Sequence, residues 1–411
     1  MNETMMQIFN YRASSHPDRT ALVFEDIIFN YREMHVWAHD TANFLKEKGV
    51  GPGDRFSVIS CNTPFTLSLW TGAAIIGAVP VYINRDFSAA EMNFILQDSR
   101  SKLLIYSGDF EDTVKELNTG EIITCKIEDL SFSIDFDENI EIISSESGSE
   151  DILIQLYTSG SDEFPEGVLL SNKSMLSMVH SLQLELPGFA ADSINLVIEP
   201  FFSIAGAGSF LLGLYTGAVN VILDDADPDE ILRTIEENGV TNVFLSSGMI
   251  QKILLSDITE KYNLTSLRNI HYSGPPMMES LLKEAYATFK CHFTHGFGLT
   301  ETSGIFTLLR FDEHIQAILS EVGGKYKKRF QSSGKPLIGM KVKIINDEGE
   351  EMPPDEPGEV IIKGENMSKG YWNSKKEFLD TDGWFHSGNK GKVDEDGFLY
   401  LLDRKKKIAA H

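Results

Sequence analysis

The sequence predicts an α/β protein whose C-terminal part is rich in β-strands. Up to Glu301, apolar strand-like runs alternate with amphipathic helical patterns, as in a doubly wound sheet. After Glu301 the pattern changes to short strands separated by Gly, Pro and Asp turns. A chain of 411 residues is long enough for two or three structural units.

Two helices can be placed from their end signals. Ser88 and Glu91 have the spacing of a capping box, so a helix is expected to begin at 89, with a strand at 102–106 after it. Asp227 and Pro228 are typical of another helix start, Gly239 of its end, and 243–245 of the next strand.

Two other regions have weaker patterns. The Ser- and acid-rich segment 128–151 is expected to be an excursion between two α/β units, within which 140–143 has the pattern of a strand. In the β-rich part, short strands are expected at 341–345, 359–363 and 398–402.

Composition and charge exclude several classes of protein. A chain with 42% hydrophobic and 24% charged residues is ordinary for a folded domain. Its net charge of -25 argues against binding to nucleic acid or to an anionic membrane. The three cysteines are too few and too widely spaced to indicate a disulfide framework or a zinc site. No signal peptide is visible, and the most apolar stretch, 69–83, is too short to span a bilayer, so we expect a cytoplasmic protein.

The most informative segment, 157–168, follows an apolar strand expected at 152–156. A run of small residues there allows backbone N–H groups to surround a polyphosphate; these residues are Thr158, Ser159, Gly160 and Ser161. Three acidic side chains lie where such a loop needs none, namely Asp162, Glu163 and Glu166. Taken alone, the segment could equally be a simple strand-to-helix turn.

Together with four further motifs in order, this loop resembles the adenylate-forming superfamily of acyl-CoA synthetases, peptide-synthetase adenylation domains and luciferases. The further motifs lie at 273–276, 297–301, 382–389 and 402–408. The resemblance implies two doubly wound α/β subdomains plus a small distorted β-barrel subdomain. It makes 1–403 a large domain, divided near 1–150, 151–300 and 301–403, and makes 404–411 a hinge remnant.

The resemblance also implies a binding site for ATP or AMP. The loop residues Thr158, Ser159, Gly160 and Ser161 would hold the outer phosphates. Adenine would lie against Ser273, Gly274, Pro275 and Phe297. Asn389 would contact the ribose, and Arg404 the ribose and phosphate. Alternatively, 273–276 is only a turn with proline at a helix start, and 388–389 is only a hairpin turn.

Two residues carry the chemistry that the resemblance implies. The hydroxyl of Thr300 would meet the α-phosphate, and Glu301 would coordinate Mg²⁺, for which a carboxylate is a suitable oxygen ligand. Such a pocket stabilises charge that develops on phosphorus. The implied substrate pocket contains Phe202, Ser203 and Gly298. No aspartate lies where amino-acid-activating relatives place one, which favours a carboxylic acid without an α-amino group.

Several departures from the family pattern predict weak ATP binding. Glu166 replaces a lysine, and unit charges about 4 Å apart interact by roughly 4 kcal/mol at an effective dielectric near 20. This exchange alone would weaken triphosphate binding by roughly 2 to 8 kcal/mol. Asn389 replaces an aspartate, and a neutral amide accepts weaker hydrogen bonds than a carboxylate.

Three functions are therefore compatible with the sequence. The first is an acyl-CoA synthetase-like ligase that forms an acyl-adenylate from ATP, working weakly or with a C-terminal domain supplied in trans. The second is a degenerate member that binds an acyl group, a carrier or an enzyme partner without ATP chemistry. The third is an ATP-independent acyl reaction, for which the sequence offers no nucleophile constellation. Expected partners are a carboxylic acid or acyl group and CoA, an acyl carrier protein or a separate C-terminal domain, with no nucleic acid and no membrane span.

Overall fold

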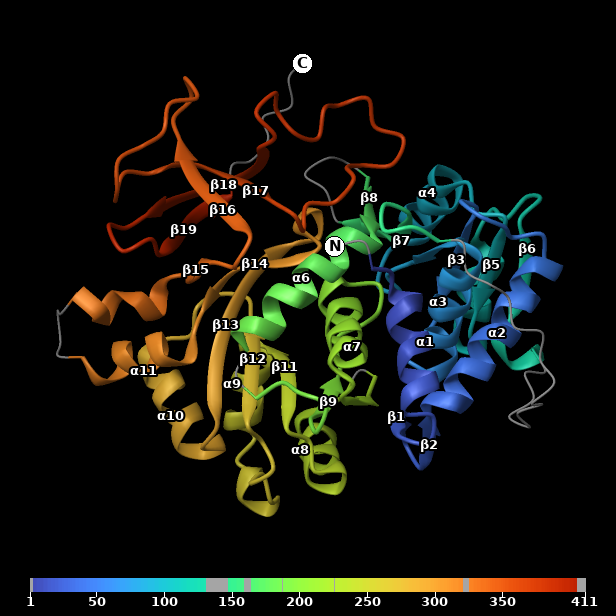
Figure 1. The fold of residues 1–411 in the computed structure, drawn as a ribbon, viewed down its shortest axis with the longest axis horizontal. Helices are drawn as coiled ribbons and strands as arrows, with labels where there is room; N and C mark the ends of the chain where they lie inside the picture. Colours follow the sequence, from blue (N-terminus) through green and yellow to red (C-terminus); the bar gives the residue numbers. More distant parts are fainter. Residues whose placement is uncertain are drawn as a thin grey trace.

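A computed structural model describes residues 3–130, 147–158, 164–186, 188–224, 226–320 and 325–404, apart from the side chains of 325, 403 and 404. These residues form two mixed sheets with helices against them and a third, antiparallel sheet (Figure 1). The predicted fold class, two α/β subdomains with a small β-rich one, is confirmed. The strand expected at 140–143 lies outside the described residues.

The first sheet has the strand order β6-β5-β3-β4-β7-β8. All its neighbouring pairs are parallel except β7 and β8, which form an antiparallel hairpin. Its strands are β3 (Arg55–Ile59), β4 (Val79–Tyr82), β5 (Leu103–Tyr106), β6 (Ile123–Lys126), β7 (Ile152–Thr158) and β8 (Glu166–Ser171).

The second sheet has the order β15-β14-β13-β12-β11-β9-β10-β1-β2. Its strands are β1 (Thr20–Phe24), β2 (Ile27–Asn30), β9 (Ile194–Val197), β10 (Val219–Ile222), β11 (Asn242–Ser246), β12 (Asn269–Ser273), β13 (His292–Leu299), β14 (Gly304–Leu309) and β15 (Lys335–Pro336). Because β1 and β2 come first in the chain but join this sheet, sheet membership does not follow chain order. The domain bounds expected from the sequence stay a prediction.

The predicted helix ends are confirmed at both places. Ser88 caps α4 with Glu91 in a capping box, and Asp227 caps α8, which ends at Gly239 in the left-handed conformation. The helices are α1 (Met5–Ser15), α2 (Tyr31–Glu47), α3 (Pro64–Ile76), α4 (Ala89–Ser99), α5 (Glu111–Glu116), α6 (Asn172–Glu185), α7 (Ile204–Thr216), α8 (Pro228–Asn238), α9 (Ser247–Leu255), α10 (Glu279–Phe289) and α11 (Phe311–Leu319).

The third sheet consists of β16 (Met340–Ile345), β17 (Gly358–Gly364), β18 (Phe385–Val393) and β19 (Leu399–Arg404), in that order. The three strands expected in this region are therefore confirmed. The alternative of a hairpin turn at 388–389 is wrong, because both residues lie inside β18, although Gly388 has the left-handed φ of 68° that glycine favours. A bulge beside this stretch lets the strand continue where its residues favour a turn.

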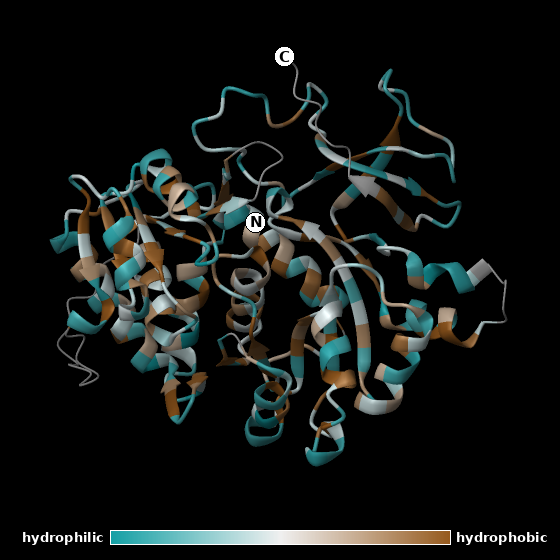
Figure 2. Cartoon of the chain, turned by 180° about the vertical axis from the view of Figure 1, so that it is seen from behind, coloured by the Kyte–Doolittle hydropathy of each residue, from teal (hydrophilic) through white to brown (hydrophobic). Residues whose placement is uncertain are grey.

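The core is continuous between the sheets. Helices α3 and α7 are apolar on nearly all sides, as buried helices require. Their side chains meet at Trp70 and Phe210, whose ring centroids are 5.8 Å apart. Figure 2 shows hydrophobic residues on the strands and inner helices and hydrophilic ones toward the outer turns. Within the described ranges, no helix has both the length and the hydrophobicity to cross a bilayer.

Candidate active site

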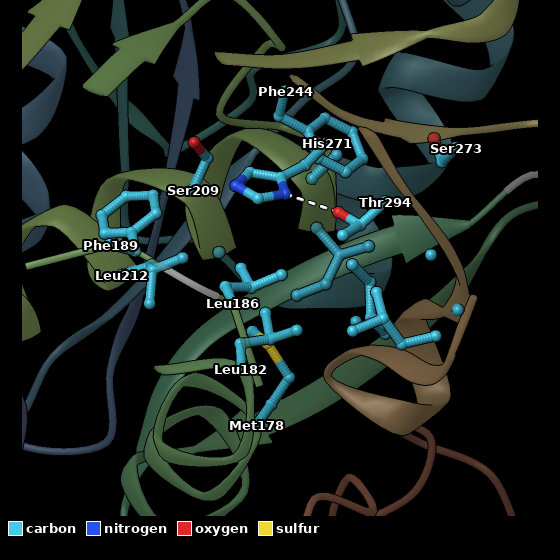
Figure 3. A pocket seen from close by; sticks show the side chains of 18 of the residues that line it. Met178, Leu182, Leu186, Phe189, Ser209, Leu212, Phe244, His271, Ser273 and Thr294 are labelled. Carbon is cyan, nitrogen blue, oxygen red and sulfur yellow. Dashed lines mark hydrogen bonds between the residues drawn. The ribbon is translucent and has the colours of Figure 1, made fainter. Parts of the chain in front are cut away.

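An apolar cavity lies between helices α6 and α7 and strands β12, β13 and β14 (Figure 3). It encloses about 120 Å³ of free volume. Most of its wall is aliphatic or aromatic, and includes Met178, Leu182, Leu186, Phe189, Ile204, Leu212, Ile305 and Leu308. A cavity of this composition suits the hydrocarbon part of a ligand.

Glycines on facing elements keep the cavity open. Gly208 lies in the middle of α7, where glycine costs about 1 kcal/mol relative to alanine. A Cβ atom there would lie 3.1 Å from the Cε atom of Met178 across the cavity. On β13, Gly296 and Gly298 also line the cavity, two residues apart and hence on one face of the strand.

One titratable side chain lies in this apolar wall. The Nδ1 atom of His271 is 2.6 Å from Oγ1 of Thr294, its partner on the neighbouring strand. Its Nε2 atom is buried and has no hydrogen-bond partner among the described residues. Burial lowers the pKa of His271 to about 4, so the imidazole is neutral at pH 7.

At the C-terminal end of β13, a tight turn presents Thr300 and Glu301. The strand ends at Leu299, the turn spans Thr300–Thr302, and β14 begins at Gly304 with a φ of 120°. The buried Thr302 holds this turn, because its Oγ1 accepts from the Leu299 backbone N (3.0 Å) and donates to the Gly304 carbonyl (2.5 Å). Sequence reasoning missed Thr302, whose only signal was its place directly after the motif.

The carboxylate of Glu301 is positioned by a distant segment. The Tyr371 hydroxyl donates to Oε1 of Glu301 at 2.8 Å, and the Ser368 backbone N donates to the Glu301 carbonyl at 2.8 Å. The same segment runs beside β8, where the Trp372 backbone N donates to the Gly167 carbonyl at 2.7 Å. Segment 368–372 therefore connects the motif of the second sheet with the hairpin of the first. Sequence reasoning missed it.

The candidate adenine residues lie at the same sheet edge. Ser273 is the last residue of β12 and lines the cavity. Gly298 of β13 also lines the cavity, so the structure brings these two candidates together. Gly274 has a φ of 95°, which favours glycine, and its carbonyl is 3.0 Å from Nε2 of His295. The alternative of a helix start with a proline of 273–276 is wrong, because α10 begins at Glu279. The ring of Phe297 packs edge-on against Phe306, with centroids 5.2 Å apart.

Two candidate substrate residues lie just before α7. Ser203 caps this helix: its Oγ accepts from the Gly206 backbone N (3.2 Å) and donates to the Pro200 carbonyl (2.8 Å). Phe202 packs against the main core. The cavity lining begins at the next residues, Ile204 and Ala205. A substrate role for Phe202 and Ser203 stays a prediction.

The expected phosphate loop is described only at its base. Thr158 is the last residue of β7 and pairs with Glu166, the first residue of β8. Its residues Ser159, Gly160 and Ser161 lie outside the described residues, as do Asp162 and Glu163. Near the base, Phe164 stacks on Phe94 with ring centroids 4.7 Å apart. The structure therefore places Glu166 on the first strand pair below the loop.

The candidate ribose residues lie in the third sheet. Asn389 on β18 pairs in register with Arg404 on β19. The Asn389 amide donates to the Ser387 carbonyl at 3.3 Å, and the Ser387 hydroxyl donates to the Val360 carbonyl at 2.6 Å. The side chain of Arg404 lies outside the described residues. Nucleotide roles for both stay predictions.

Magnesium is the metal that the motif implies. Within the described residues, no group of three or more His, Cys, Asp or Glu side chains is placed to hold a metal ion. Mg²⁺ is commonly bound by one or two carboxylates together with substrate phosphates, so Glu301 fits a shared site of that kind.

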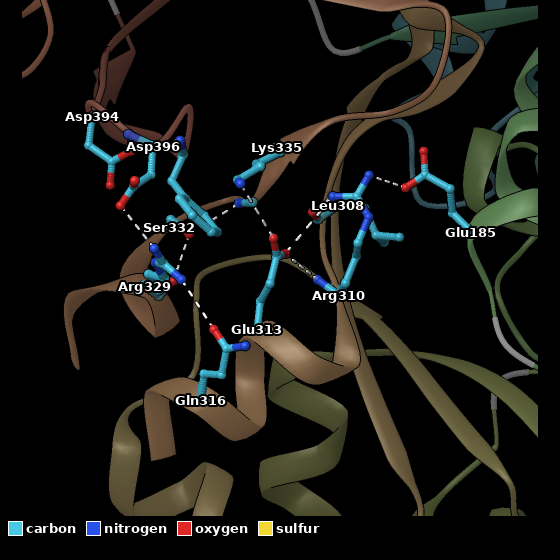
Figure 4. Close-up of polar contacts among 12 residues, drawn as sticks. Glu185, Leu308, Arg310, Glu313, Gln316, Arg329, Ser332, Lys335, Asp394 and Asp396 are labelled. Atoms are coloured by element: carbon cyan, nitrogen blue, oxygen red, sulfur yellow. Dashed lines mark hydrogen bonds and ion pairs between the residues drawn. The ribbon is translucent and has the colours of Figure 1, made fainter. Parts of the chain in front are cut away.

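A polar network lies around the ends of α6 and β14 and helix α11 (Figure 4). Arg310, which follows β14, pairs with Glu185 at the end of α6. Glu185 also accepts from the Ile338 backbone N at 2.7 Å, and only 4% of its side chain is exposed. Farther along, Arg329 pairs with Asp396 at 2.9 Å. The first pair fixes α6 against the end of β14, and the Arg329–Asp396 pair joins the segment after α11 to the turn between β18 and β19.

Comparison with known proteins places these features in a family. A family model described as AMP-binding enzyme matches residues 9–372. The fatty acid–acyl-carrier-protein ligase ScoC of Streptomyces coeruleorubidus is 28% identical over 415 residues, covering 98% of this chain and 78% of ScoC. A feruloyl-CoA synthase of an Amycolatopsis species is 30% identical over 399 residues, covering 96% of this chain and 77% of that enzyme.

Solved structures agree in fold. The N-terminal domain of FACL13 from Mycobacterium tuberculosis superposes with a TM-score of 0.87 at 25% identity, covering 98% of this chain and all of that domain. The o-succinylbenzoate CoA synthetase MenE from Bacillus subtilis, solved with its acyl-adenylate intermediate OSB-AMP, superposes with a TM-score of 0.85 at 26% identity. That match covers 98% of this chain and 79% of MenE.

Proposed function

Because the chain belongs to the AMP-binding enzyme family, we propose that it activates a carboxylic acid with ATP, with the acyl group in the cavity described above. One observation carries the proposal. Strand β13 contributes Gly296 and Gly298 to the cavity wall and then leads directly into the turn that presents Thr300 and Glu301. An acid whose hydrocarbon part fills the cavity would have its carboxylate beside that turn.

In the proposed reaction a carboxylate oxygen of the acid attacks the α-phosphorus of ATP. A new bond forms between that oxygen and phosphorus, the bond between the α-phosphorus and the bridging oxygen breaks, and pyrophosphate leaves with the bonding electrons. The products are the acyl-adenylate and pyrophosphate. The Thr300 hydroxyl would donate to an α-phosphate oxygen and stabilise the charge that develops there.

The protein contributes mainly positioning to this step. Mg²⁺, when bound, supplies positive charge next to the phosphates, and Glu301 would hold it. The Tyr371 hydroxyl fixes one carboxylate oxygen of Glu301, and Thr302 fixes the turn. Holding the reacting groups in place in this way lowers the entropy cost of reaching the transition state.

The acid that we propose has an apolar acyl part and no α-amino group. The cavity wall is mainly aliphatic and aromatic, and none of the described residues that line it has a carboxylate that could pair with an ammonium group. The names of the relatives mention fatty acids, a feruloyl group and succinylbenzoate, so they differ in the acid but share transfer to a thiol of CoA or of a carrier protein. We propose such a thiol as the final acceptor here.

A second function is favoured by the base of the phosphate loop. Glu166 pairs with Thr158 in the strand register, and the motif resemblance implies a lysine at this position in the family. Together with Asn389 in place of aspartate, this supports a member that binds an acyl group, a carrier or a protein partner without ATP chemistry.

One assay distinguishes the two proposed functions. Release of pyrophosphate from ATP and Mg²⁺ by the 411-residue chain should depend on an added carboxylic acid, tested with aliphatic and aromatic acids of graded length. Glu301→Gln should remove the activity, because an amide is a poor ligand for Mg²⁺. Acid binding without any acid-dependent release of pyrophosphate would overturn ATP-driven activation and support the second function.

A further inference from the structure

We propose that the acid bound in the cavity carries a hydroxyl group at the end remote from its carboxylate, and that His271 recognises this hydroxyl. The inference rests on the proposed function and deepens it, because it defines the class of acid. It makes His271 a specificity-determining residue that sequence reasoning did not single out.

The first observation is an unpaired polar atom in an apolar wall. His271 is only 7% exposed and lines the cavity, yet its Nε2 atom has no partner among the described residues. Leaving a buried polar atom unpaired destabilises the empty site, because the atom has lost its hydrogen bonds to water without a replacement. A ligand group that bonds to this atom would recover that free energy only when the cavity is filled.

The second observation is that the ring is held in one orientation. Its Nδ1 atom is 2.6 Å from Oγ1 of Thr294, and the ring stacks on Phe189 with centroids 6.2 Å apart and planes 29° apart. Figure 3 shows one ring nitrogen directed at Thr294 and the other pointing away from it, in the direction of Ser209 in this view. The free nitrogen is therefore preorganised for a ligand rather than free to rotate toward another partner.

The chemistry of a neutral imidazole selects the ligand group. One ring nitrogen donates and the other accepts, and the bond to Thr294 is compatible with either arrangement. A hydroxyl group can donate or accept, so it satisfies Nε2 in both tautomers. A carboxylate or an ammonium group would match only one tautomer and would bring a full charge into an apolar cavity, which is far more costly to desolvate.

The position of His271 places this hydroxyl at the remote end of the acid. Thr294, its partner on β13, lies four residues before Gly298, which adjoins the Thr300–Glu301 turn. At roughly 3.3 Å per residue, the strand separates the two ends by about 13 Å. His295 also has an unpaired buried nitrogen, but it does not line the cavity.

The test compares acids that differ only in the remote hydroxyl. Binding of 3-phenylpropanoate and 3-(4-hydroxyphenyl)propanoate, and of octanoate and 8-hydroxyoctanoate, is measured by calorimetry on the full chain. The hydroxylated acid should bind at least tenfold more tightly in at least one pair. His271→Phe should reduce that ratio to about one, since phenylalanine fills the space without a polar atom.

Matched variants separate recognition from structure. His39→Phe removes a buried histidine from α2, outside the cavity, and should keep the preference of the wild type. Thr294→Val removes the partner that orients the ring and should lower the preference at least threefold, whereas Thr294→Ser should keep it. If His271→Phe does not fold, the comparison of Thr294→Val with Thr294→Ser still tests whether His271 recognises the hydroxyl.

The outcomes distinguish this inference from the proposed function. Equal binding within both pairs, or a preference that survives in both His271→Phe and Thr294→Val, overturns the role of His271 and leaves acid activation intact. Absence of binding by all four acids overturns the assignment of the cavity to an acid, and both proposals with it.

Discussion

We assign a carboxylic acid to the cavity between α6, α7 and β13, and the outer phosphates of ATP to the β7–β8 hairpin. The two regions differ in how well they suit these ligands. The cavity is apolar, kept open by glycines, and adjoins the turn that presents Glu301. At the hairpin, the first residue of β8 is Glu166, an acid at the proposed phosphate site, where positive charge would be needed. Under the proposed function, acid binding and ATP handling are therefore separable, and the predictions below test each side and then the link between them.

The largest effect is expected from filling the cavity. Gly208→Leu places a side chain where α7 faces Met178, so it should weaken binding of a carboxylic acid at least 100-fold, about 2.7 kcal/mol. Gly208→Ala is the control, because alanine favours the helix by about 1 kcal/mol and adds only one methyl group. Calorimetry with both variants checks this. Tight acid binding by Gly208→Leu would place the acid elsewhere.

On the hairpin side, the expected effect is a gain. The combined change Asp162→Thr, Glu163→Gly and Glu166→Lys replaces repulsion by attraction and should raise ATP affinity at least tenfold, about 1.4 kcal/mol. Acid affinity should not change. Glu348→Lys makes the same charge change as Glu166→Lys on an exposed turn of the third sheet and should have little effect. A repaired loop that leaves ATP affinity unchanged would refute the electrostatic explanation.

Acid conditions should lower the stability of the folded chain. Burial lowers the pKa of His271 to about 4 and that of His314 to about 3. An unfolded histidine has a pKa near 6.5, so the unfolded chain binds more protons below that pH. Stability should fall as the pH drops from about 6.5 toward 4, by up to about 1.4 kcal/mol per pH unit for each histidine.

Urea unfolding at several pH values measures this slope. His271→Phe and His314→Phe should each show a shallower dependence than the wild type between pH 6.5 and 4.5. Variants with the slope of the wild type would show that these histidines are not neutral in the folded chain.

The smallest effect concerns the link between the two sides. Tyr371→Phe removes the hydroxyl that donates to Glu301 but keeps the ring, which packs against Phe378. Loss of one hydrogen bond costs about 1 kcal/mol, so the rate of pyrophosphate release should fall about fivefold and more Mg²⁺ should be needed. Tyr400→Phe removes a comparable hydroxyl in the third sheet and should change neither quantity. An unchanged Mg²⁺ requirement in Tyr371→Phe would argue against this positioning role.

What the sequence could predict depended on how local the signal was. The ends of α4 and α8 follow from capping residues a few positions apart, and the order of strands and helices follows from hydrophobic periodicity. Strand β18 was harder, because Gly388 and Asn389 favour a turn, and the strand continues through them by pairing Asn389 with Arg404 of β19 and the flanking His386 and Lys390 with β17.

The residues of the candidate site also differ in how local their sequence signals are. Thr300 and Glu301 stand out as a short motif, whereas Tyr371 contacts Glu301 across 70 positions of the chain. The Trp372 indole donates to the Asp98 carbonyl across 274 positions, a pairing that no local pattern encodes. His271 lies in a short apolar strand, where a histidine is indistinguishable from an ordinary core residue until the unpaired Nε2 atom is seen.

The most direct test of the contrast between the two sides is a comparison of two dissociation constants in the presence of Mg²⁺. One is for ATP, and the other is for a non-hydrolysable acyl-adenylate mimic, whose acyl part would fill the cavity and which lacks the outer phosphates. We predict that the mimic binds at least tenfold more tightly than ATP, because only ATP must place its β- and γ-phosphates beside the acidic loop. ATP that binds as tightly as the mimic would contradict the account.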